Sequence, residues 1–219
     1  MLLVLVAAAA ALAGRLAIER RSAIRIEPWP GLAALAESNA RPSPRGRSGA
    51  LVLGPAAARV SVHIFADYTC AACDRLEQRA GDSLRSLARA GLIRLYHHHA
   101  PILGRPADFA AHALACAVEA GEPWLLHAAL YAIDGRERGA PPSEAILNAS
   151  PRLGELPALR TCLRTPAPDA ARPAIAHARR LGIHEVPTVV VDGQRVRYRS
   201  SGRLLDFITD HAIGRQRER

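Results

Sequence analysis

Lysine is absent from this sequence of 219 residues, so all 29 basic side chains are arginines. Aromatic residues make up only 4% of the chain, and we find neither an internal repeat nor a nucleic-acid-binding motif. The formal net charge of +9 would suit a nucleic acid, but the arginines are spread along the whole chain. We therefore interpret the charge as a solvated surface and expect no nucleic-acid partner.

Cysteine is scarce as well, with four residues in total, of which only Cys70 and Cys73 form a C-x-x-C pair. A structural zinc ion needs four ligands at suitable spacing. The consecutive residues His97, His98 and His99 could not all converge on one ion, because neighbours on a strand point to opposite faces. We therefore predict no metal and no cofactor, and we interpret the three histidines as the polar end of a strand.

No apolar run reaches the roughly 20 residues of a membrane-spanning helix. The run Leu2–Ala13 instead has the length of the hydrophobic part of a signal sequence, and it ends in an Ala-x-Ala-like cleavage site. Arginines follow this run rather than precede it, which is unusual for an exported protein. We expect residues 1–21 to be a signal peptide, or a membrane anchor formed by residues 2–14. The alternative is a hydrophobic tail packed on the domain.

Proline, glycine and arginine mark residues 22–50 as a linker. We expect the folded domain to span residues 51–213 and a basic tail to follow at 214–219. The domain begins with a predicted strand at 60–67, a helix at 70–90 and a strand at 92–96, which together form a βαβ unit with parallel strands. Helices are predicted at 107–120, 123–133, 143–148, 155–164, 169–181 and 203–213, with a hairpin of strands starting at 186 and ending at 199.

Cys70 and Cys73 lie directly after the first predicted strand, at the start of the predicted helix. Residues three apart on a helix share one face, and this separation suits a disulfide. The unpaired backbone N–H groups and the helix dipole favour a thiolate at the first position. The sequence therefore predicts a reactive dithiol with Cys70 as the nucleophile.

Three segments resemble the DsbA-like family of exported thiol oxidoreductases. They are Phe65–Cys73 with its Cys-Ala-Ala-Cys, Glu122–Trp124, and Gly182–Gly193 with its Val-Pro-Thr. The resemblance covers residues 51–213. It implies an α/β, thioredoxin-like fold with an inserted helical subdomain at about 105–166.

The resemblance also implies that the peptide bond before Pro187 is cis and that this proline faces the dithiol. Val186 would then pair with an extended substrate chain by strand addition, with Thr188 beside it. Ala71 and Ala72 would meet the substrate between the two cysteines. Because neither alanine carries a charge or a ring, no imidazole stabilises the thiolate, and the direction of the redox reaction stays open.

Asp67 occupies an acidic position that is common in the family. It either relays protons to Cys73 or caps the active-site helix. The resemblance further implies a structural disulfide between Cys116 and Cys162 in the helical insertion. The alternative is that both are buried, free thiols.

Together these features predict an exported, monomeric thiol-disulfide oxidoreductase in the periplasm or another extracytoplasmic compartment. It would form disulfides in cysteine-containing exported proteins and be recycled by a membrane redox partner. Two alternatives stay open: a reductase or isomerase of the same fold, and a non-catalytic module that binds extended peptides.

Overall fold

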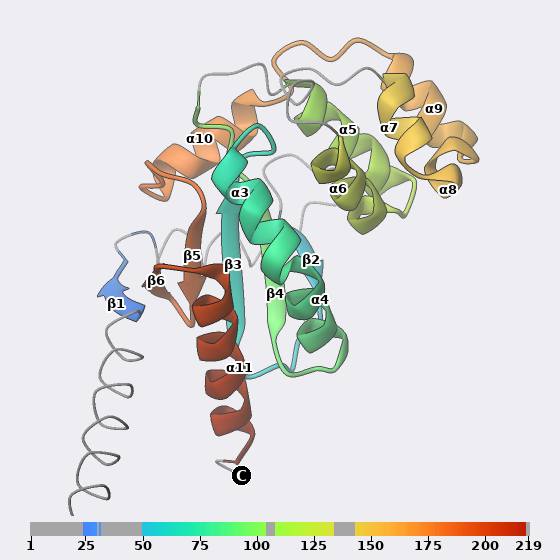
Figure 1. Ribbon diagram of the computed structural model, residues 1–219. Coiled ribbons are helices and arrows are strands. Elements are labelled where there is room, and N and C mark those ends of the chain that lie inside the picture. Colours follow the sequence, from blue (N-terminus) through green and yellow to red (C-terminus); the bar gives the residue numbers. More distant parts are fainter. Residues whose placement is uncertain (1–23, 30, 32–49, 104–107, 134–142, 218–219) are drawn as a thin grey trace, which may run out of the picture.

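The computed structural model describes residues 24–29, 31, 50–103, 108–133 and 143–217. Within these ranges, six strands form one mixed sheet in the order β1-β6-β5-β3-β4-β2, with helices on both faces (Figure 1). None of the helices in these ranges is both long and apolar enough to cross a membrane. The predicted leader at 1–21 and most of the predicted linker lie outside the described residues.

The centre of the sheet is the predicted βαβ unit. β3 (Ser61–Ala66) and β4 (Arg94–His99) pair in parallel, as the sequence predicts. β5 (Thr188–Val191) runs antiparallel to β3 and forms a hairpin with β6 (Gln194–Tyr198). β2 (Leu51–Leu53) closes the far edge against β4. The carboxyl end of β3 therefore lies next to the start of β5.

The helix after β3 is continuous but not uniform. It consists of α3 (Ala71–Leu76), a π-helical turn η1 (Glu77–Gly81) and α4 (Asp82–Arg89). A Cβ atom at Gly81 would collide with the carboxylate of Glu77, so the glycine leaves room for this acidic side chain against the helix. Periodicity predicts one regular helix here and does not predict the π-helical turn.

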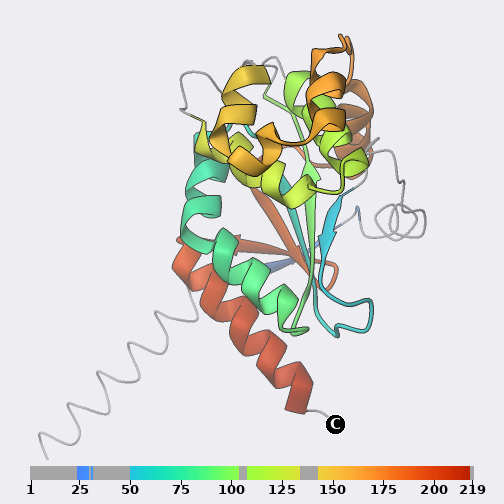
Figure 2. The ribbon, with the colours of Figure 1, turned by 90° about the vertical axis from the view of Figure 1, so that its right-hand side faces the viewer.

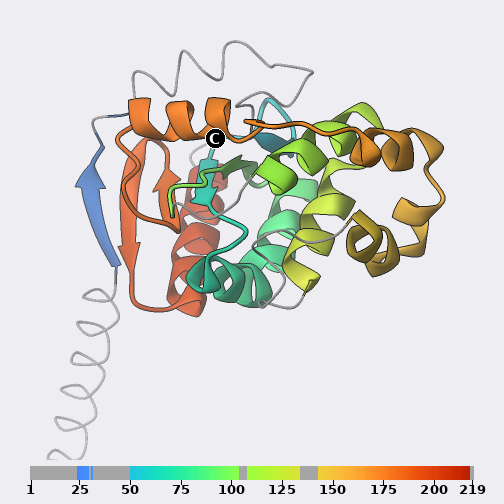
Figure 3. The same ribbon diagram turned by 90° about the horizontal axis from the view of Figure 1, so that it is seen from above.

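Helices cover the two faces of the sheet unequally (Figure 3). α10 (Arg172–Arg180) covers one face over a small core that includes Trp29 and Phe65. The long helix α11 (Ser201–Arg217) and the α3–α4 helix cover the other face over the larger core. Cys70 and Cys73, at the start of α3, therefore lie on the face of the sheet that carries the larger core.

A helical subdomain is inserted between β4 and α10, which confirms the predicted architecture (Figure 2). Its helices are α5 (Asp108–Glu119), α6 (Pro123–Ala132), α7 (Ser143–Ala149), α8 (Pro151–Gly154) and α9 (Pro157–Arg164). Trp124 of α6 donates its indole N–H to the carbonyl oxygen of Val52 at 3.3 Å, which ties the subdomain to β2.

The structure corrects both ends of the predicted domain. β1 (Ile24–Pro28) lies inside the predicted linker and pairs antiparallel with β6, and Trp29 is only 5% exposed. An edge strand is held mainly by backbone hydrogen bonds and buries few side chains, so its sequence pattern is weak. At the other end, α11 continues to Arg217, because arginine is a good helix former, and the prediction of a tail from residue 214 is wrong.

The three histidines do end a strand, as predicted, but the interpretation of that end as a polar one is wrong for His97 and His98. β4 extends through His99, and His97 and His98 are only 4% and 2% exposed. They point to opposite faces: His97 packs edge-on to His127 of α6, whereas His98 stacks on Phe65. Contacts with aromatic neighbours on the two faces of the sheet thus keep these two imidazole rings buried.

Candidate active site

Cys70 and Cys73 lie at the junction between β3 and α3. The backbone N–H of Cys70 donates to the carbonyl oxygen of Asp67 at 3.0 Å, and this turn ends the strand and starts the helix. Cys70 is the N-cap of α3, and its sulfur accepts a hydrogen bond from the N–H of Cys73 at 3.4 Å. Both thiols are free in this structure, with Cys70 8% exposed and Cys73 1% exposed.

The pKa values of the two thiols are shifted in opposite directions. A hydrogen bond from the Cys73 side chain lowers the pKa of Cys70 to about 6, against the opposing effect of burial. Backbone N–H groups of Cys73 and Ala72 add to the lowering, whereas the charge of Asp67 raises this pKa. The same side-chain hydrogen bond, together with burial, raises the pKa of Cys73 well above its usual value. At neutral pH the pair therefore holds one thiolate, at Cys70, and one thiol.

The loop before β5 lies against this dithiol. The sulfur of Cys70 is 3.7 Å from the carbonyl oxygen of Val186, and the peptide bond between Val186 and Pro187 is cis. Thr188 is buried, and its hydroxyl donates to the carbonyl oxygen of Glu185 at 2.8 Å, so this hydroxyl already has a partner. Val186 and Pro187 are half-buried, and the carbonyl oxygen of Val186 contacts the sulfur of Cys70.

Asp67 is buried, and its carboxylate serves the turn before the helix. Its Oδ1 atom accepts hydrogen bonds from the backbone N–H of Thr69 at 2.8 Å and from the Thr69 hydroxyl at 2.7 Å. The cap of α3 is Cys70, so the interpretation of Asp67 as a helix cap is wrong. Its charge nevertheless acts on both sulfurs, since it raises the pKa of each cysteine.

Sequence reasoning missed an acidic residue one helical turn beyond Cys73. Glu77 forms an ion pair with Arg85 and lies 3.3 Å from Nε2 of His127, whose Nδ1 hydrogen-bonds the Tyr68 hydroxyl at 2.8 Å. Burial raises the pKa of Glu77, but His127 and Arg85 lower it by more, so the net value is below the usual one. The signal was the i, i+4 spacing from Cys73, which places Glu77 on the same helix face.

A second missed feature is a groove of about 360 Å³ beside the dithiol, lined by Ala72, Val186, Pro187 and five arginines. The arginines are Arg75, Arg79, Arg195, Arg197 and Arg199. Their spacing carried a signal, because residues four apart on a helix and two apart on a strand lie on the same side. Ala71 is exposed next to Cys70 and does not line this groove.

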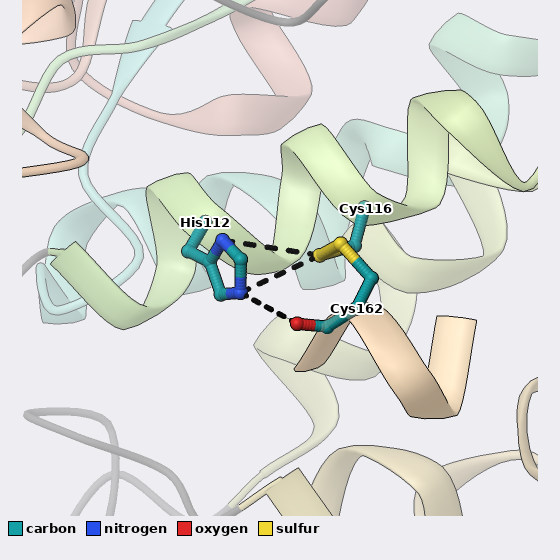
Figure 4. Close-up of side chains that lie close together, drawn as sticks. All are labelled: His112, Cys116 and Cys162. Carbon is teal, nitrogen blue, oxygen red and sulfur yellow. Dashed lines mark hydrogen bonds between the residues drawn. A yellow bond between two sulfur atoms is a disulfide. The ribbon is translucent and has the colours of Figure 1, made fainter. Parts of the chain in front are cut away.

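In the insertion, Cys116 of α5 and Cys162 of α9 form a disulfide, with Cα atoms 5.7 Å apart (Figure 4). His112 lies against it, with Nε2 3.6 Å from the Cys116 sulfur and 2.9 Å from the Cys162 carbonyl oxygen. These three residues carry metal-ligand atoms within 4.8 Å of one another. Because both sulfurs are in the disulfide, neither is available as a thiolate ligand.

The chain is similar to known proteins over most of its length. Residues 47–210 match the family model described as thioredoxin. A thioredoxin-like oxidoreductase from Silicibacter pomeroyi DSS-3 is 27% identical, with a TM-score of 0.55 over 78% of this chain and 93% of that chain. Oxidised DsbA of Mycobacterium tuberculosis is 18% identical, with a TM-score of 0.57 over 74% and 92%.

A further structure with this fold is MdbA from Actinomyces oris, described as a thiol-disulfide oxidoreductase. It is 14% identical, with a TM-score of 0.60 over 74% of this chain and 85% of that chain. No curated protein matches the chain. These solved structures therefore share the fold of this chain.

Proposed function

Because the chain belongs to the thioredoxin family and has the fold of its DsbA-like members, we infer that it catalyses thiol-disulfide exchange in an exported compartment. Its direction would be the formation of disulfides in cysteine-containing exported proteins. The observation that carries this proposal is the pairing of two thiols whose pKa values are shifted in opposite directions. Cys70 has a pKa of about 6 beside the exposed end of α3, whereas Cys73 is buried with a raised pKa.

The reaction begins from the Cys70–Cys73 disulfide. A substrate thiolate attacks the sulfur of Cys70, the bond between the two cysteines breaks, and the sulfur of Cys73 leaves and takes up a proton. A second substrate thiolate then attacks the substrate sulfur of this mixed disulfide. Cys70 leaves as a thiolate, and its low pKa makes it a good leaving group. The substrate loses two electrons and the cysteine pair gains them, which yields the reduced pair.

Stabilisation of the Cys70 thiolate supports the oxidising direction, because it favours the reduced pair over the disulfide. The backbone of Val186, 3.7 Å from the sulfur, supports the binding of an extended substrate chain. The Cys116–Cys162 disulfide supports an oxidising, extracytoplasmic location. Continued turnover would require a membrane redox partner that accepts the two electrons.

The deciding experiment is the equilibrium reduction potential of Cys70–Cys73 against a glutathione series. A value near about −120 mV, the DsbA end of the scale, is expected and identifies a disulfide donor. A value near about −270 mV, the thioredoxin end, would instead identify a reductase. A Cys70→Ser variant that still exchanges disulfides would contradict the assigned nucleophile. Peptide binding without any exchange in the wild-type protein would leave only the non-catalytic module.

A further inference from the structure

The groove beside the dithiol is strongly basic. Its charged lining consists of the five arginines named above and a single glutamate, Glu185, which leaves an excess of four positive charges. Arg75 and Arg79 come from the helix that carries the cysteines, whereas Arg195, Arg197 and Arg199 come from β6 and its end. The charge therefore gathers from two segments more than a hundred positions apart in the sequence.

Internal ion pairs account for only part of this charge. Glu185 pairs with Arg197 and lies 3.6 Å from Arg195, and Arg197 also contacts Glu27 at 3.1 Å. Among the described residues, the exposed side chains of Arg75, Arg79 and Arg199 have no ion pair or hydrogen bond. The Nε atom of Arg195 is buried and has no hydrogen-bond partner among the residues that the structure describes.

The start of α11 adds to the positive potential. Ser200 and Ser201 line the groove, and the Ser200 hydroxyl caps the helix by accepting the N–H of Arg203 at 3.3 Å. The amino end of a helix carries a partial positive charge and favours anions. Guanidinium groups bind carboxylates through paired hydrogen bonds, so the arginines and this helix end would favour the same kind of ligand.

The groove also adjoins the dithiol through Val186, although neither cysteine lines it. Val186 lines it, and the carbonyl oxygen of Val186 is 3.7 Å from the sulfur of Cys70. A peptide whose cysteine reaches Cys70 and whose backbone follows Val186 would therefore place its neighbouring residues along the arginines. We propose that this groove selects substrate segments in which aspartate or glutamate flanks the reactive cysteine. This inference rests on the proposed function and adds to it the substrate class.

The test uses the whole protein in its oxidised form and dithiol peptides of equal length. The peptides differ only in the residues that flank the cysteines: aspartate and glutamate, serine and glutamine, or arginine. The second-order rate of peptide oxidation is followed by alkylation and mass spectrometry at low and high ionic strength. We expect the acidic peptide to react at least about tenfold faster than the neutral one at low ionic strength. Salt should reduce this ratio by screening.

A triple variant, Arg75→Gln, Arg79→Gln and Arg199→Gln, removes the three arginines without internal partners. It should reduce the acidic preference to about twofold or less. The matched control is Arg89→Gln, Arg160→Gln and Arg179→Gln, which removes the same charge from exposed positions outside the groove. The control should keep the full preference and the rate with the neutral peptide. An equal loss in both variants would reduce the effect to net charge and overturn the proposal.

A binding measurement separates failure of the groove from failure of the proposed function. Fluorescence anisotropy of the labelled acidic peptide with serine in place of both cysteines reports docking without redox chemistry. We expect this peptide to bind more tightly than its neutral counterpart, and inorganic phosphate to compete only weakly. Equal affinities would overturn the acidic-substrate proposal even if exchange is active. Tighter acidic binding with no exchange of any peptide would overturn only the proposed function.

Discussion

The sulfur of Cys70 and the carbonyl oxygen of Val186 lie 3.7 Å apart, although 116 positions separate them in the sequence. The same sulfur accepts the N–H of Cys73 at 3.4 Å, so it lies between a helix start and the half-buried loop before β5. The helix side stabilises the thiolate, and in the proposed function a substrate chain would lie along the loop side. The side chain of Cys73, one helical turn further on, is only 1% exposed.

This arrangement predicts different outcomes for the two cysteine-to-serine variants. Cys73→Ser cannot form the Cys70–Cys73 disulfide, so its Cys70 thiolate should attack a disulfide-bonded peptide and release one peptide thiolate. The resulting mixed disulfide at Cys70 should accumulate, because no Cys73 thiol is present to resolve it. Cys70→Ser should form none and should lose activity by several orders of magnitude, since buried Cys73 has a raised pKa. Non-reducing electrophoresis and mass spectrometry distinguish the two. Mixed disulfides at Cys73 in the Cys70→Ser variant would contradict the assignment.

The charge of Asp67 predicts a change in thiol acidity. Asp67→Asn keeps an oxygen that accepts from Thr69 but removes the charge, so the pKa of Cys70 should fall below its wild-type value of about 6. The thiolate stabilises the reduced pair fully above the ordinary thiol pKa, and this stabilisation is lost as the pH falls through the Cys70 pKa. In the variant, that loss should move to lower pH. Thiolate absorbance as a function of pH measures the Cys70 pKa in the wild-type protein and in the variant.

Asp67→Ala is the matched control for this prediction. It removes the charge and also leaves the N–H and hydroxyl of Thr69 without their acceptor. It should therefore lower the free energy of unfolding by about 1–3 kcal/mol, whereas the asparagine variant should lose less. A pKa for Cys70 that is unchanged in both variants would show that Asp67 acts on the turn alone.

The buried histidines predict sensitivity to acid. Burial lowers the pKa of His63 to about 4 and holds the pKa values of His97 and His98 well below the usual range. These rings are neutral in the folded protein, whereas the unfolded chain takes up protons near pH 6.5. Stability is therefore complete above about pH 6.5 and is lost as the pH falls toward 4.

Urea unfolding at a series of pH values tests this with His63→Gln. The variant loses the hydrogen bond between His63 and His98, so it should be less stable at neutral pH. Its stability should also depend less on pH between 6.5 and 4, by up to about 1.4 kcal/mol per pH unit. His184→Gln, at an exposed position, is the control and should keep the wild-type pH dependence. Equal slopes in all three proteins would refute the role of His63.

The Cys116–Cys162 disulfide predicts a stability effect that is separate from activity. It links residues 46 positions apart, for which the chain-entropy model gives about 4 kcal/mol. The double variant Cys116→Ala and Cys162→Ala should lower the free energy of unfolding by about this amount, as measured in urea. Its Cys70 pKa should match the wild type. A changed Cys70 pKa would instead couple the insertion disulfide to the active site.

Local sequence was enough to predict where the two cysteines lie. A β-branched run followed by Cys-Ala-Ala-Cys places a dithiol at a helix start, and backbone geometry there is set by neighbouring residues. The parallel β3–β4 pair followed from the same local patterns, whereas the position of the insertion followed from the family resemblance. β1 could not be predicted in this way, since its main support is hydrogen bonding to β6, far away in the chain.

The environment of the centre was decided by the tertiary structure. Burial between packed layers made His97 and His98 core residues. The hydrogen bond with Cys70, together with burial, raised the pKa of Cys73. Arg75 and Arg199 are ordinary surface arginines in the sequence and become part of one groove only when the fold brings α3 and the end of β6 to the same cavity. Local backbone preferences act between near neighbours, whereas desolvation and electrostatic potential depend on every atom nearby. For this reason the sequence alone determined where the dithiol lies, and the fold decided its acidity and what surrounds it.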